Sequence, residues 1–393
     1  MATSAAQIRS YKGPALLSYG FRPFFLLGAA WAALALPVFL LELEGYFALP
    51  STLSPVAWHA HEMVFGYAPA IAAGFLLTAV PNWTGRLPII GRPLALLVLA
   101  WLAGRVAMAV SLWIGPVQAG AIDLMFLGTL LLVTAREVIA AGNTRNLKVL
   151  LVLAALLVAN AVSHVEAYAG ASSSYGRSLG IAATIMLISL IGGRIVPSFT
   201  RNWLTKNAPG RLPAQFSHFD MAVLVITATS LAAWTAAPQA RVTALLAVFA
   251  ATANVWRLWQ WVGWRAAREP LVLILHVAFA FVPVGFALVA LAGLMPQTIS
   301  MAGALHGWTA GAIALMTLAV MTRASLGHTG QPLVATKQIT SIYLAVLLAA
   351  VARIAVAFGL WREPLLLISA LSWTGGFLGF VIVFAPLLSK RRA

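Results

Sequence analysis

The chain has 393 residues, of which 62% are hydrophobic and only 9% are charged, whereas a soluble globular protein carries about 25% charged residues. Its net charge of +16 would suit a nucleic-acid binder, but the basic residues occur in short clusters between apolar runs, which argues against nucleic acid as a partner. Because the chain has no cysteine, disulfides, thiolate metal ligands and cysteine nucleophiles are excluded.

Twelve stretches are long and apolar enough to cross a bilayer as helices, each of which needs about 20 apolar residues. They are expected at 17–42, 56–80, 93–114, 119–140, 147–169, 178–197, 219–237, 240–262, 270–294, 298–321, 338–360 and 364–388. The first is expected to be a retained helix and not a cleaved targeting segment. The predicted fold is an all-α polytopic membrane protein, a single integral domain over residues 1–393, with the lipid bilayer as its main partner.

The basic residues predict an orientation. If the N-terminus is cytoplasmic, twenty of the 25 Lys and Arg residues fall on the inner side of the spans. The outer side receives Arg177, Arg241 and Arg362, and Arg105 and Arg353 lie within spans. This asymmetry predicts a multi-pass protein of the bacterial inner (cytoplasmic) membrane with both termini in the cytoplasm.

A weak periodicity accompanies the spans. The second, sixth and tenth each end in a polar motif, at residues 81–86, 194–203 and 322–330. Three four-helix units would fit this spacing.

Ionisable side chains inside a membrane are costly and often mark function. In the first span, Arg22 either snorkels to the interface or pairs with an anion such as a haem propionate. His59 and His61 begin the second span, and on a regular helix they would point about 200° apart and serve two different sites. The face of His59 carries Glu62 and looks like a polar or metal-binding face, whereas the face of His61 carries Phe65 and resembles the wall of an apolar macrocycle pocket.

Later spans add three more intramembrane histidines. His164 lies near the outer end of the fifth span, where Asn160, one turn earlier, would orient its ring. His276 enters the ninth span about 9 Å from the inner side, and His306 lies about 12 Å below the outer edge of the tenth. Each of them alone could also be only an interhelical hydrogen-bonding residue.

Three further observations concern charge and solvation. His218 and His328 fall at the cytoplasmic interface, where solvation explains them. Arg105 and Arg353 need partners, which Asp123, Glu166 or a carboxylate-bearing cofactor would supply. Without cysteine, imidazole is nearly the only strong ligand that the chain offers to haem iron or copper.

The motifs resemble those of the NnrS family, the haem- and copper-containing membrane proteins associated with nitric oxide in denitrifying and other bacteria. The matching segments are residues 20–25, 58–67, 73–85, 193–200, 304–309 and 323–330. The block in the second span, Trp58-His59-Ala60-His61-Glu62-Met63-Val64-Phe65-Gly66-Tyr67, is the longest and most specific.

This resemblance implies a twelve-span protein that binds haem b and copper and acts in nitric oxide metabolism or in protection from nitrosative stress. Redox conversion of nitric oxide would make it an oxidoreductase with an electron donor, a quinol or a cytochrome. We predict His61 and His306 as haem ligands on opposite sides of the macrocycle, with His276 and Arg22 as further haem-binding residues. His59 and His164 are predicted near copper, and His61 and His306 are also metal-ligand candidates.

Two other functions fit the same sequence. Twelve spans with weak repeats suit a transporter or a protein that handles metallocofactors, which would show substrate flux and no tightly bound chromophore. A redox partner that only passes electrons would show haem reduction without consumption of nitric oxide.

Overall fold

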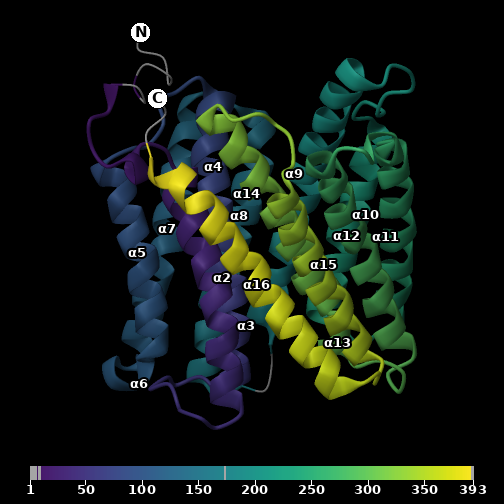
Figure 1. Cartoon of the computed structure of the whole chain (residues 1–393). Coiled ribbons are helices and arrows are strands. Elements are labelled where there is room, and N and C mark those ends of the chain that lie inside the picture. Colours follow the sequence, from purple (N-terminus) through teal and green to yellow (C-terminus); the bar gives the residue numbers. More distant parts are fainter. Residues whose placement is uncertain (1–6, 8–9, 172–173, 391–393) are drawn as a thin grey trace. The chain divides into compact units, whose positions relative to one another are not determined.

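The computed structural model describes residues 7, 10–171 and 174–390 (Figure 1). Within this part of the chain every regular element is a helix. The long helices are α2 (Phe21–Leu43), α4 (Ala68–Thr84), α5 (Arg92–Ala109), α7 (Pro116–Ala140), α8 (Leu147–Tyr168), α9 (Tyr175–Asn207), α10 (His218–Ala236), α11 (Arg241–Gln260), α12 (Pro270–Leu294), α14 (Ala314–Thr329), α15 (Lys337–Ala357) and α16 (Arg362–Ser389). Short helices are η1 (Ala15–Leu17), α3 (Pro55–His61), α6 (Ser111–Ile114), η3 (Thr144–Asn146), η4 (Gly263–Ala266) and α13 (Met301–Ala304).

Twelve helical spans in the described residues are long and apolar enough to cross a membrane. Each coincides with one of the twelve expected stretches, so the prediction of an all-α, twelve-span membrane protein is confirmed. Prolines mark several helix starts: α3, α7 and α12 all begin with one. A proline there loses nothing, because the first N–H groups of a helix have no partner within the helix.

The second and tenth spans are not regular α-helices. Between α3 and α4 the second span is π-helical over η2 (Glu62–Tyr67), and the tenth is π-helical over η5 (Gly307–Ile313) between α13 and α14. Each π-helical segment begins directly after a histidine, His61 in one span and His306 in the other. Such segments insert an extra residue into a helix and are frequent at functional sites.

The sixth span is longer than expected. The sequence predicts an end at Pro197, but α9 continues through this proline to Asn207. A proline inside a helix removes one hydrogen bond, and membrane helices tolerate the loss where other groups bond the freed backbone. The polar motif after Pro197 is therefore an extension of the helix and not a loop.

Contacts between α-carbons divide the chain into two compact units. The first comprises residues 1–180, 324–331 and 377–393, and the second comprises 181–323 and 332–376. These two units do not correspond to the three four-helix units that the motif spacing suggests, which stay a prediction. The single integral domain stays a prediction.

In the first unit, α7 packs against α5, α8 and α4, and α4 packs against α2. Phe21, Phe24 and Phe25 of α2 are fully buried. In the second unit α12 packs along α11 and against the π-helical segment η5, where Trp308 donates its indole N–H to the carbonyl of Val282 at 3.1 Å.

A candidate metal centre in the first unit

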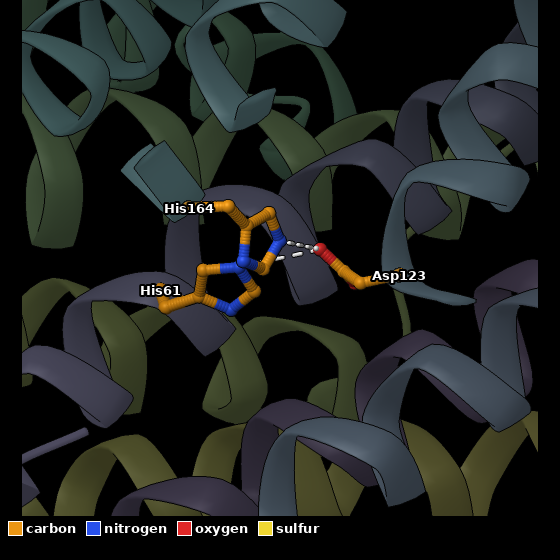
Figure 2. Close-up of side chains that lie close together, drawn as sticks. All are labelled: His61, Asp123 and His164. Carbon is orange, nitrogen blue, oxygen red and sulfur yellow. Dashed lines mark hydrogen bonds and ion pairs between the residues drawn. The ribbon is translucent and has the colours of Figure 1, made fainter. Parts of the chain in front are cut away.

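Two histidines and an aspartate meet in the interior of the first unit. His61 ends α3, Asp123 lies on α7 and His164 lies on α8, so three separate helices supply the group. Figure 2 shows the two imidazole rings side by side, with Asp123 approaching them from the opposite direction. One ligand atom from each residue lies within 4.8 Å of the others, and the group can hold a metal ion.

Both imidazole rings contact the same carboxylate oxygen. Nε2 of His61 lies 3.3 Å from Oδ2 of Asp123, and Nε2 of His164 lies 3.0 Å from it. A tetrahedral ion with bonds of 2.0–2.1 Å holds its donor atoms about 3.3 Å apart. The two nitrogen–oxygen separations are compatible with a small coordinated ion and equally with hydrogen bonds to the carboxylate.

Two further charged side chains complete the cluster. Arg105 of α5 donates from Nη2 to Oδ1 of Asp123 and from Nη1 to Oε2 of Glu62 at 2.6 Å. The other oxygen of Glu62 lies 3.4 Å from Nδ1 of His61. Arg105, Glu62 and Asp123 are all at most 2% exposed, so they rely on one another for compensation of charge.

The contacts around His61 put two hydrogen-bond acceptors next to its second ring nitrogen, Nε2. If Nδ1 donates its proton to Glu62, Nε2 carries a lone pair and faces two oxygens: Oδ1 of Asn160 at 3.2 Å and Oδ2 of Asp123. The amide of Asn160 is oriented by its own bond, since Nδ2 donates to Oδ2 of Asp123 at 2.7 Å. Three acceptors that face one point are stable only with a cation among them, either a proton or a metal ion.

Three glycines make room for this cluster. A β-carbon on Gly66 would lie 2.5 Å from Nη1 of Arg105, and one on Gly104 would lie 2.9 Å from Oδ1 of Asp123. A β-carbon on Gly120 would lie 3.1 Å from the His164 ring. Larger residues would push the helices apart or displace the charged groups.

His59 does not share the site of His61. Its ring stacks on Phe39, with centroids 4.3 Å apart, so the two histidines point to different surroundings, as predicted. Phe65 is beside His61, as predicted, with ring centroids 5.3 Å apart. Glu62, however, was expected on the side of His59, and its carboxylate instead contacts His61 and Arg105.

The role predicted for Asn160 also differs. It was expected to orient His164, but it contacts His61 and Asp123, and Asp123 contacts His164. The reason is that the three helices meet at Asp123, which sequence spacing on α8 alone does not reveal.

His276 and His306 belong to the second unit. His276 is buried, and its Nε2 is 2.8 Å from the hydroxyl of Thr200. His306 donates from Nδ1 to the carbonyl of Ala302 at 2.9 Å. Because His61 lies in the first unit, the pairing of His61 with His306 across a haem stays a prediction.

Arg22 has a structural contact. It is 5% exposed, and its Nη1 donates to the carbonyls of Leu388 and Lys390 at the end of α16. A guanidinium there satisfies carbonyls that have no partner within the helix. Its predicted role as an anion or propionate partner stays a prediction.

The remaining charged candidates divide simply. His218 and His328 are exposed, and the ring of His328 also packs against Tyr19 and Phe21, so the solvated role expected of both stays a prediction. Arg105 pairs with Asp123, one of its candidate partners, whereas Glu166, the other candidate side chain, accepts from the backbone N–H groups of Tyr175 and Gly176.

The contact of Asp123 with the two histidines is not predicted from the sequence, which offers this residue only as a candidate partner for Arg105. The available signal was its position, because a carboxylate eight residues into a span must be neutralised by something. What the sequence lacks is the distance from Asp123 to the two histidines.

These features define a multi-pass membrane protein with a buried histidine–carboxylate cluster that can hold a metal. A family model described as NnrS protein matches residues 15–392. The chain belongs to this family and is a membrane protein related to nitric oxide. No curated protein matches the chain.

Proposed function

We propose that the His61–Asp123–His164 group is a copper centre, and that the protein acts in nitric oxide metabolism or protection in the bacterial inner membrane. The observation that carries this proposal is the convergence of two imidazole nitrogens on one oxygen of a buried aspartate. Family membership supports the link to nitric oxide.

The charge of the cluster supports a cation. With neutral imidazoles, Glu62 and Asp123 contribute two negative charges and Arg105 one positive charge, which leaves a net charge of −1 in a buried site. An uncompensated charge in a medium of low dielectric constant is costly. One monovalent cation restores neutrality, either a proton on His61 or copper(I), which has affinity for imidazole.

The chain's own residues have separable tasks. Nε2 of His61, Nε2 of His164 and an oxygen of Asp123 would hold the ion. Glu62 would accept the Nδ1 proton of His61 and thereby set its tautomer. Arg105 holds the other oxygen of Asp123 in place. Copper, when bound, supplies one-electron redox chemistry.

We assign haem b to the second unit in this proposal, with His306 as its ligand. The bond from Nδ1 of His306 to a backbone carbonyl is the usual way in which a metal-binding imidazole is oriented, and it sets the tautomer that has its lone pair on Nε2. His61 is assigned to the metal centre in preference to haem, because His164 and Asp123 lie beside its ring.

Metal analysis of purified protein tests the centre. The variants His61→Ala, Asp123→Ala and His164→Ala should each lose stoichiometric copper during purification, while His218→Ala, at an exposed position, should retain it. Full copper retention in all three variants would remove the assignment.

Absorption spectra test the proposed haem site. A Soret band that is lost in His306→Ala but retained in His276→Ala supports haem at His306. Consumption of nitric oxide by reduced protein distinguishes turnover from simple electron transfer. Substrate flux in proteoliposomes without a bound chromophore would favour a transporter.

A further inference from the structure

A pocket reaches the candidate metal centre from the end of the first unit where the second span begins. Its volume is about 220 Å³, and it is lined by Thr52, Leu53, Met108, Ser111, Pro116, Ala119, His164, Ala167 and Tyr168. By the distribution of basic residues this is the outer side of the membrane.

His164 connects the pocket to the cluster. It is the only one of the three candidate ligands in the pocket lining, and its side chain is 16% exposed, compared with 4% for His61 and 1% for Asp123. A solute in this pocket therefore approaches the cluster beside His164.

The pocket walls favour a small ligand. The volume is below the 300–1,000 Å³ typical of sites for drug-sized molecules. Five of the nine lining residues are apolar, and the hydroxyls of Thr52 and Ser111 bond to each other at 3.1 Å. No carboxylate lines the pocket, so an anion meets no like charge there.

The charge balance selects the ligand class. A divalent ion added to a cluster of net charge −1 gives a total of +1, and one monoanion then restores neutrality inside the membrane. A monovalent ion leaves the cluster neutral and gives an anion no reason to enter.

We propose that this pocket is a binding site for a small monoanion, which reaches the divalent form of the metal centre beside His164. The inference rests on the proposed metal centre. It names a ligand class and an entry route that the centre alone does not imply.

Azide binding to copper(II)-loaded, purified protein tests the proposal. Azide should produce a charge-transfer band and a change in the electron paramagnetic resonance spectrum of copper(II). Ala167→Trp should fill the pocket from an exposed position and weaken azide binding at least 10-fold, with copper content unchanged. Ala169→Trp, at an exposed position outside the lining, is the matched control and should bind azide normally.

Equal azide affinity in wild type and Ala167→Trp, or no azide binding to copper-loaded wild type, overturns the pocket while the metal centre stands on its copper content. Failure of the metal-centre proposal has a different signature, because the His61, Asp123 and His164 variants would then retain copper. Either result is read from metal content and spectra and needs no activity assay.

Discussion

Asp123 is the residue on which the buried cluster depends. Its two oxygens together meet Arg105, Asn160, His61 and His164. One side chain thus links the guanidinium of Arg105 on α5 to both histidines. Its replacement should affect stability and metal binding together.

Asp123→Asn should reduce the free energy of unfolding by about 3–5 kcal/mol, because it leaves the guanidinium of Arg105 short of one buried partner. Thermal denaturation in detergent and copper content provide the measurement. Glu137→Gln breaks another arginine–carboxylate pair, with Arg86, whose side chain is 39% exposed. This control should cost at most about 1 kcal/mol. Similar losses in both variants would contradict a special role for the buried pair.

A separate prediction concerns the packing around Gly104. Gly104→Ala places a methyl group 2.9 Å from Oδ1 of Asp123 and 3.2 Å from its α-carbon, so α5 and α7 must move apart at a cost of about 1–3 kcal/mol. Gly128→Ala on α7 meets nothing within 4 Å and should stabilise its helix by about 0.5–1 kcal/mol. Opposite shifts in melting temperature are expected, and a neutral Gly104→Ala variant would argue against tight packing here.

The π-helical segment η2 controls how the second span presents His61 to α7 and α8. A regular α-helix has 3.6 residues per turn, so one residue more or fewer turns the flanking segments by about 100° relative to each other. Glu62 lies within this segment and contacts His61, the residue just before it. The segment therefore affects the rotation of α3, which carries His61, relative to α4.

Deletion of Val64 should regularise η2 and separate His61 from Asp123 and His164, so copper should be lost while the helical circular dichroism remains. Deletion of Ala48, in the connection between α2 and α3, should leave both unchanged. Copper retention after the Val64 deletion would mean that the π-helical segment does not position the histidine.

Across the whole chain, the twelve spans and the distribution of basic residues make a prediction about orientation. The absence of cysteine makes it simple to test, since a single introduced cysteine is the only thiol. Gln239 lies between α10 and α11 and Gln331 follows α14, and both are exposed.

Gln239→Cys should react with a membrane-impermeant maleimide in intact spheroplasts, and Gln331→Cys should react only after permeabilisation. Labelling is followed by a mass shift on gels. The reverse pattern would invert the topology and place the pocket beside His164 on the cytoplasmic side.

The sequence by itself determined that a lipid bilayer surrounds the chain, how many spans it has, and which residue types are available for metal binding. These are local properties: about 20 apolar residues make a span wherever they occur, and a chain without cysteine must use imidazole or carboxylate. For Arg105 the sequence predicted only that a charge within a span needs a partner, with Asp123, Glu166 or a carboxylate-bearing cofactor as candidates. The structure selects Asp123 and adds Glu62.

Only the tertiary structure decided which residues meet. His61, Asp123 and His164 are separated by 62 and 41 positions in the chain, and nothing in the spacing on one helix specifies the rotation and depth of its neighbours. Glu62 contacts His61, although an ideal helix places it on the face of His59. Packing of α7 against α8 brings Asp123 to His164, and packing of α7 against the second span brings it to His61. Helices form from local hydrogen bonds, but a site built from three of them depends on how their surfaces pack.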